Sequence, residues 1–293
     1  MKLIKLNKKN LAILLASSSL MLAACKKDGN PNNLPDVDAS SYAGKIDGYA
    51  NADEVYSSNL VAYWSFDDTN NELKSNSAPT SSLNTSYITG VKGKALKLNA
   101  GYLYYGKQFD VFKSEALKSF TISSWVQIAN NGSKKTMLMT IARPNTFLGS
   151  LDFRLNTNST STTMLGIGPR FTALGGGSQD NLNASLSPAF GANVWTHIVL
   201  AYNGTTGIFK IWADGKDIGS YNSRGTGNNA FKAYEPGEFI IGAHYNNIPG
   251  KEITGSAADF AAMTGSIDEV RIYNTVLQDA SIKALYNLGK AGK

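Results

Sequence analysis

Residues 120–128 alternate between two kinds of position, and this pattern limits the possible folds of the chain more than any other. Side chains two residues apart in an extended strand point to the same side, whereas a helix repeats every ~3.6 residues. One side would carry Phe120, Ile122, Ser124, Val126 and Ile128, and the other Thr121, Ser123, Trp125 and Gln127. The segment is therefore predicted to be a β-strand.

Short runs of similar composition recur along most of the chain after residue 59. They are rich in Val, Ile, Thr and aromatic residues, which suit a pleated and partly buried surface. Clusters of Gly, Asn, Asp and Ser separate them, as expected for turns. The main predicted strands are residues 60–66, 95–98, 120–128, 137–141, 194–202, 208–212, 238–242 and 266–273.

Only one stretch has helical spacing, and it lies near the C-terminus. Ile282, Leu285 and Leu288 are three residues apart, and Gly289 is placed to end the helix. Asp279 or Ser281 could cap its start. Many strands and one helix predict an all-β domain over residues 59–293, as an antiparallel two-sheet sandwich or a closed barrel.

The amino terminus has the pattern of an export signal. Four lysines precede an apolar run of about 14 residues, which is too short to span a bilayer. Leu22-Ala23-Ala24-Cys25 resembles the bacterial lipobox, in which a peptidase cuts before a lipidated cysteine. This resemblance predicts a lipoprotein signal peptide over residues 1–24 and a lipid on Cys25. The alternative is an ordinary secretory signal followed by an unrelated cysteine.

Cys25 is the single cysteine of the chain, so no internal disulfide can form. The fold must depend on its apolar core, or on a metal ion. The formal net charge of +6 falls to about +2 once the four lysines of the signal are removed. We therefore predict no nucleic-acid partner.

Residues 25–58 are rich in Asn, Pro, Gly, Ser and Asp, and no amphipathic pattern can be built from them. They are predicted to form a flexible tether reaching roughly 30 Å from the lipid. Lys26-Lys27-Asp28 resembles the charged signals that export some lipoproteins to the cell surface; the alternative is a plain linker. The predicted location is the outer membrane, facing the cell exterior.

Several segments, in the same order and spacing, resemble laminin-G-like domains of the concanavalin A-like lectin/glucanase superfamily. This resemblance implies a two-sheet antiparallel jelly-roll sandwich with a short C-terminal helix. Residues 143–190 match nothing in that pattern and are expected to form a long loop region. The segments that carry the resemblance are residues 60–67, 120–126, 195–199, 211–216 and 265–274, followed by the helix ending at Leu285-Tyr286.

Catalysis is not predicted. Glycan hydrolases of this fold place acidic residues at alternating strand positions, because the two catalytic carboxylates must lie close together. None of the seven glutamates lies two residues before an aspartate, and no Gly-x-Ser-x-Gly motif is present. The two histidines are His197 and His244, and His197 is interpreted as a structural imidazole.

A calcium site is a further expectation, and it comes from the resemblance. Asp67 ends the first predicted strand and Asp268 begins the last, and family members often bind calcium where these ends meet. Backbone carbonyls near residues 90–93 would have to complete the six to eight oxygen ligands. The alternative is that both aspartates cap turns and pair with Lys or Arg.

Aromatic and amide side chains are the candidates for ligand binding. Sugar rings stack on aromatic faces, and their hydroxyls bind Asn, Asp and Gln. We predict a lipid-anchored protein that binds a polysaccharide or other glycan without cleaving it. The alternatives are an adhesin or a subunit of a surface protein complex, and then a glycan hydrolase or lyase. The candidate ligand-binding residues are Tyr102, Tyr104, Arg170, Phe171, His244, Tyr245 and Asn246, although tyrosines on strands also serve sheet packing.

Overall fold

A computed structural model describes residues 43–128, 134–157, 165–180, 188, 193–222, 224–253 and 259–293. The predicted signal peptide, Cys25 and the first part of the predicted tether lie outside the described residues. The folded unit comprises Gly44–Lys293. No described helix is both long and apolar enough to cross a membrane.

Thirteen strands are present in the described part of the chain. The eight predicted strands are all among them, and β4 has the predicted bounds. The strands are β1 (Leu60–Trp64), β2 (Ser81–Thr89), β3 (Lys94–Tyr105), β4 (Phe120–Ile128), β5 (Lys135–Ala142), β6 (Leu151–Thr157), β7 (Leu165–Thr172), β8 (Ser178–Asp180), β9 (Thr196–Asn203), β10 (Ile208–Ala213), β11 (Lys216–Ser220), β12 (Glu238–Ile241) and β13 (Met263–Tyr273).

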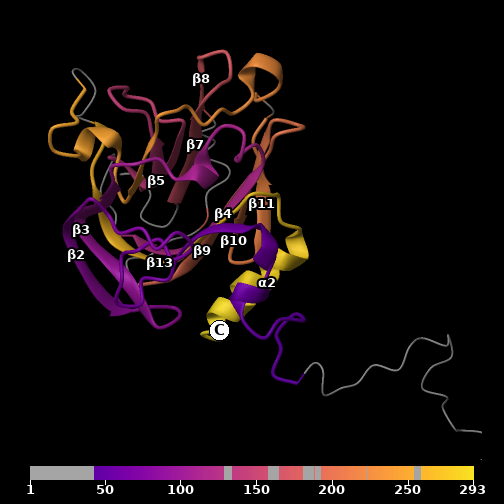
Figure 1. The fold of residues 1–293 in the computed structure, drawn as a ribbon. Coiled ribbons are helices and arrows are strands. Elements are labelled where there is room, and N and C mark those ends of the chain that lie inside the picture. Colours follow the sequence, from indigo (N-terminus) through magenta and orange to yellow (C-terminus); the bar gives the residue numbers. More distant parts are fainter. Residues whose placement is uncertain are drawn as a thin grey trace, which may run out of the picture. The chain divides into compact units, whose positions relative to one another are not determined.

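The strands pair antiparallel in the order β11-β10-β9-β4-β13-β3-β12-β5-β6-β7-β8, with β1 on β13 and β2 on β3. Because β3 pairs with both β13 and β12, the hydrogen bonding is continuous and the sheet curls over on itself (Figure 1). We call β12 and β5–β8 the front layer, and β9–β11, β4, β13 and β3 the back layer. The predicted all-β jelly-roll fold is confirmed.

The main core lies between these two layers. Phe171 of β7 lies 5.3 Å, centroid to centroid, from Phe209 of β10, so the front layer packs directly on the back layer. Trp64 of β1 stacks on Phe239 of β12 at 5.0 Å. Both contacts join residues far apart in sequence, and apolar burial at the alternating strand positions stabilises the sandwich without any disulfide.

Helix α2 (Asp279–Lys290) covers the outer face of the back layer (Figure 1). Leu285 and Leu288 are buried against Trp212 and other residues of a second apolar cluster, as the helical spacing predicted. The expected cap is absent: Gln278 is the N-cap residue, and the Asp279 carboxylate accepts a hydrogen bond from Trp212 Nε1 at 3.2 Å. Packing against the sheet therefore takes the place of capping.

The domain begins earlier than predicted. Residues 44–58 were assigned to the tether, yet Ala52 and Val55 are buried in the cluster beneath α2. Two 3₁₀ helices, η2 (Ala52–Glu54) and η3 (Ser57–Asn59), lead into β1. The side chain of Asn51 caps η2 by accepting a hydrogen bond from Asp53 N at 2.9 Å. The domain starts before the predicted boundary because a few apolar residues in a polar segment are enough to hold it against helix α2.

The region 143–190 also differs from the expectation of a long loop, because it contains β6, β7 and β8. Strands β6 and β7 carry apolar residues on one side and polar or charged residues on the other, such as Phe153 between Asp152 and Arg154. Strand β2 was missed because it is almost entirely polar and exposed. The remaining short 3₁₀ helices are η4 (Asp110–Phe112), η5 (Gly227–Asn229) and η6 (Tyr245–Asn247).

Candidate functional site

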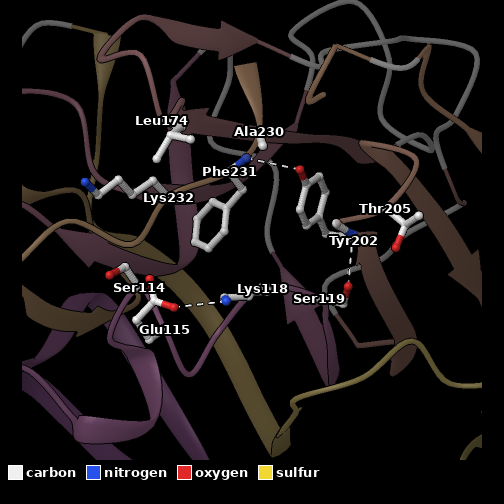
Figure 2. A pocket seen from close by; sticks show the side chains of 11 residues that line it. Ser114, Glu115, Lys118, Ser119, Leu174, Tyr202, Thr205, Ala230, Phe231 and Lys232 are labelled. Atoms are coloured by element: carbon white, nitrogen blue, oxygen red, sulfur yellow. Dashed lines mark hydrogen bonds and ion pairs between the residues drawn. The ribbon is translucent and has the colours of Figure 1, made fainter. Parts of the chain in front are cut away.

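Four segments that are distant in sequence surround a pocket of about 500 Å³ at one edge of the sandwich (Figure 2). One follows η4, one follows β7, one follows β9, and one follows η5. We call this the loop pocket. It is lined by Ser114, Glu115, Lys118, Ser119, Leu174, Tyr202, Gly204, Thr205, Ala230, Phe231 and Lys232.

Two aromatic rings form its floor. Phe231 and Tyr202 belong to a group of packed rings that also includes Phe120, with Phe231 and Phe120 centred 5.2 Å apart. The Tyr202 hydroxyl accepts a hydrogen bond from Phe231 N and donates one to Gly225 O, each at 3.0 Å. Burial raises the pKa of Tyr202, so the hydroxyl stays protonated at neutral pH. The floor is therefore fixed in position.

The rim of the loop pocket is polar, with one exposed apolar residue. Glu115 and Lys118 form an exposed ion pair at 2.9 Å, and Ser119 Oγ accepts a hydrogen bond from Gly204 N at 2.9 Å (Figure 2). Leu174 stands on the rim with 52% of its surface exposed. Apolar walls with a few polar groups are typical of small-molecule sites.

Three of the predicted ligand-binding residues come together elsewhere, on the side of the sheet away from the main core, where β3 pairs with β12. Tyr102, Tyr104 and Tyr245 are buried in one apolar cluster. The Lys251 ammonium lies 5.6 Å from the Tyr104 ring centroid and 5.8 Å from that of Tyr245. The segment around η6 covers the three tyrosines, so little of their ring surface is open to a ligand.

His244 and Asn246 shape this covering segment. His244 Nδ1 accepts a hydrogen bond from Asn246 N at 3.2 Å, and the Asn246 side chain binds both backbone groups of Ile253 at 3.1 Å. Burial lowers the pKa of His244 to about 4. Both side chains are buried and stabilise the local backbone.

Arg170 and Phe171 are adjacent on β7 but face opposite sides. Arg170 lies opposite Asp152 in the pairing of β6 with β7, whereas Phe171 lies in the main core. Burial raises the pKa of Asp152 to about 6. The predicted pair therefore cannot act on one ligand from one surface.

The two aspartates predicted to bind calcium approach one loop, residues 90–94. Asp67 Oδ1 accepts a hydrogen bond from Lys94 N at 2.7 Å, and Asp268 Oδ2 accepts one from Val91 N at 2.7 Å. The loop passes so closely that a Cβ on Gly90 would lie 2.4 Å from the Asp268 carboxylate, and one on Gly93 would lie 2.0 Å from that of Asp67.

Asp268 Oδ1 is buried and has no hydrogen-bond partner in the described part of the chain. Burial, with the charge of Glu269, raises the pKa of Asp268 to about 8. Left-handed backbone at Phe66, Asp68 and Glu269 surrounds the pair. No group of three or more His, Cys, Asp and Glu side chains able to hold a metal exists among the described residues. The 90–94 loop turns backbone N–H groups, not carbonyls, toward the two carboxylates, which is the turn-capping arrangement. Asp268 Oδ1 is left open to a cation, and calcium could complete its ligands with water and other backbone oxygens.

His197 lies under α2 and is inaccessible, in keeping with its structural interpretation. Its Nε2 is 2.9 Å from Ser123 Oγ, and burial lowers its pKa to about 3. Trp125 packs on it with ring centroids 5.0 Å apart. A serine and histidine that are both buried cannot act on a polymer.

A family model described as the concanavalin A-like lectin/glucanases superfamily matches residues 106–283, more than half of the chain. Domain 4 of AbnA, an extracellular arabinanase from Geobacillus stearothermophilus solved with arabinotriose, is similar over 78% of this chain and 98% of its own, with 19% identity and a TM-score of 0.51. No curated protein sequence matches the chain significantly.

Two toxin domains are similar at 15% identity. The binding domain of Paraclostridial Mosquitocidal Protein 1 covers 78% of this chain with a TM-score of 0.52. The binding domain of botulinum neurotoxin serotype C1 covers 80% with a TM-score of 0.54. The match spans 52% of each toxin chain. At these identities the likeness shows the fold alone.

Proposed function

Because the chain belongs to the concanavalin A-like lectin/glucanases superfamily, we propose that its sandwich is a non-catalytic module that binds carbohydrate. The observation that carries this proposal is the loop pocket. The exposed Leu174, together with the small accessible part of Phe231, can contact the C–H face of a sugar ring, and the serines and charged groups of the rim can bind its hydroxyls. The arabinanase domain solved with arabinotriose supports the proposal as a relative in fold.

The charges of the loop pocket favour binding without cleavage. Glycoside hydrolysis by the usual mechanisms requires a pair of carboxylates within about 10 Å of each other. Glu115 is the one carboxylate among the lining residues, and it is exposed and paired with Lys118. A single carboxylate cannot supply both the acid and the base or nucleophile that this chemistry requires.

Affinity electrophoresis of residues 44–293 against a panel of neutral and acidic polysaccharides, arabinan included, tests the proposal. We expect retardation by at least one polysaccharide and a clear loss of it in Leu174→Ser. Val194→Ser is the matched control, because Val194 is 60% exposed and is not among the pocket-lining residues. Retardation by none of the polysaccharides would refute the proposal, and equal losses in both variants would exclude the loop pocket as the site.

A second candidate function is protein binding, and strand β2 is the observation that favours it. In the described part of the chain β2 pairs only with β3, and it exposes Leu83 and Tyr87. An open strand edge can accept another strand. If this is the function, a partner protein should co-purify with the wild type and be lost in Leu83→Lys, without any polysaccharide being bound.

We also propose that Asp67, Asp268 and the 90–94 loop hold a structural calcium ion. The support is the unpartnered buried oxygen of Asp268 and the close approach of the loop. Binding would stabilise the folded state by mass action. Calcium should raise the melting temperature of the wild type over that in EDTA, and Asp268→Asn should lose this difference. An identical melting curve in calcium and EDTA would contradict the proposal.

The lipid on Cys25 and an outer-membrane location facing the cell exterior are proposed from the sequence pattern of residues 1–28. The anchor would hold a binding domain outside the cell, where polysaccharides are met. Metabolic labelling with a fatty acid should mark the wild type and not Cys25→Ser. Protease added to whole cells should then degrade the domain; protection in intact cells would argue for the opposite orientation.

A further inference from the structure

Two cations lie against one tyrosine ring at the margin of the loop pocket. The Arg143 guanidinium carbon is 4.3 Å from the ring centroid of Tyr234, and the Lys232 ammonium nitrogen is 4.8 Å from it. Lys232 also lines the pocket, and Figure 2 shows its side chain beside Leu174, with the ammonium directed away from Tyr202. A cation over an aromatic face is attracted by the negative charge of that face.

The tyrosine itself is held at both ends. Tyr234 N donates a hydrogen bond to Ser150 Oγ at 2.9 Å, and the Tyr234 hydroxyl donates one to Ala173 O at 2.8 Å. Ala173 precedes Leu174 of the rim, so the ring is tied to the pocket wall. The two cations are therefore kept near one place.

Neither cation is neutralised. Among the described ion pairs, no carboxylate lies within 4.0 Å of Arg143 or Lys232. Arg143 Nη1 donates a long hydrogen bond to Thr172 Oγ1, at 3.4 Å. By contrast, the buried Arg154 and Arg271 are both paired with carboxylates.

The carboxylates near the pocket are already engaged. Glu115 pairs with Lys118 at 2.9 Å, and Glu235 accepts hydrogen bonds from Ser114 N at 3.2 Å and Ser114 Oγ at 3.4 Å. Positive charge is thus left over on the Lys232 side of the pocket. A half-buried cation loses part of its hydration. An anionic group on a ligand would compensate this loss with a charge-assisted hydrogen bond to the cation.

We infer that the loop pocket takes an acidic saccharide, with the anionic group of the sugar against Lys232 and the positive charge of Arg143 behind it. This inference rests on the proposed function and names the class of its ligand. The sugar ring would lie over Phe231 and Leu174, and its charged substituent would point toward Tyr234. The anionic group can be the carboxylate of a uronic acid or a sulfate ester, since both accept hydrogen bonds from an ammonium.

The experiment compares ligands that share a sugar backbone and differ in whether it carries anionic groups. Polygalacturonate is tested beside its fully methyl-esterified form, and dextran sulfate beside dextran, by affinity electrophoresis and calorimetry on residues 44–293. We expect at least one charged member to bind roughly tenfold more tightly than its neutral partner, the size of one charge-assisted hydrogen bond. The advantage should shrink as salt rises. Binding of polygalacturonate would indicate a uronate ligand, and binding of dextran sulfate would indicate a sulfate ester.

Lys232→Met should lower the affinity for the charged member roughly tenfold and lower that for the neutral member clearly less. Lys283→Met is the control, because it removes the same charge from an exposed position on α2. Equal binding of the charged and neutral members of both pairs would overturn the inference and leave the proposed function in place. Equal losses in the two lysine variants would also overturn it. The wild-type comparison of paired ligands holds even if Lys232→Met folds poorly, and binding of no polysaccharide at all would refute the proposed function itself.

Discussion

Helix α2 closes one face of the sheet, whereas the segments around Phe231 leave a pocket open at its edge. Under α2, Leu288 and Trp212 are buried and the polar groups of His197 and Arg271 have no access to solvent. At the loop pocket, Leu174 is exposed and its charged neighbours reach water. The same sandwich therefore buries apolar surface under α2, where it stabilises the fold, and leaves apolar surface accessible at the loop pocket. Substitutions under α2 should therefore change the stability of the protein, and substitutions at the loop pocket should change saccharide binding.

The largest expected effect is a loss of protein stability on substitution of a residue buried beneath α2. Leu288→Ala should lower the free energy of unfolding by about 2–5 kcal/mol, because it leaves a cavity in the cluster under α2. Lys283→Ala, on the exposed side of the same helix, should change it by less than about 0.5 kcal/mol. Urea unfolding measures both. Saccharide binding by the folded fraction should be unaffected, and an equal loss of stability in both variants would contradict the comparison.

The second largest effect is expected on the pH dependence of stability, and it comes from His197, which lies under α2. Burial holds the pKa of His197 at about 3, below its ordinary value of 6.5, so between these values the unfolded chain binds a proton that the folded chain does not. The free energy of unfolding should therefore fall with decreasing pH, by up to about 1.4 kcal/mol per pH unit from this residue.

His197→Gln isolates this contribution, because His244 and Asp152 titrate equally in both proteins. Unfolding measured from pH 7 to pH 4 should show a shallower dependence in the variant. Parallel curves would mean that His197 takes up its proton in the folded state at an ordinary pH. Saccharide binding should not share this dependence, since no histidine lines the loop pocket.

The smallest effect on stability is expected at the pocket rim. Lys118→Ala breaks an exposed ion pair with Glu115, which contributes at most about 1 kcal/mol. The same change should weaken saccharide binding measurably, because Lys118 faces the pocket. Thermal unfolding and calorimetry on the same samples decide the point. A large loss of stability with unchanged binding would reverse the assignment of the two regions.

The difference between the two regions also explains what could be predicted from the amino-acid sequence. Strand β4 and helix α2 carry their own periodicities, so each was predicted from its own residues. Strands β6 and β7 were missed because their polar sides, with Asp152, Arg154 and Arg170, were interpreted as loop. Strand β2 has no buried side chain, and its place depends on backbone pairing with β3.

The loop pocket could not be predicted, because no short segment contains it. Lys118, Leu174, Thr205 and Phe231 come together only when the two layers close. The tyrosines and His244 that were predicted as ligand-binding residues are instead buried, since an aromatic residue serves packing and recognition equally well. Asp67 and Asp268 were correctly expected to meet at one loop, and calcium there remains a prediction.

The contacts at the start and end of the folded unit have a practical consequence. Lys293 Nζ donates a hydrogen bond to Gly44 O, and Asn287 Nδ2 donates one to Asp47 Oδ2 at 2.6 Å. The backbone thus enters and leaves the domain at neighbouring points. A few added residues would join them into a ring, so this body could be permuted or carried as an insert within a surface turn of a host protein, with its sheets undisturbed.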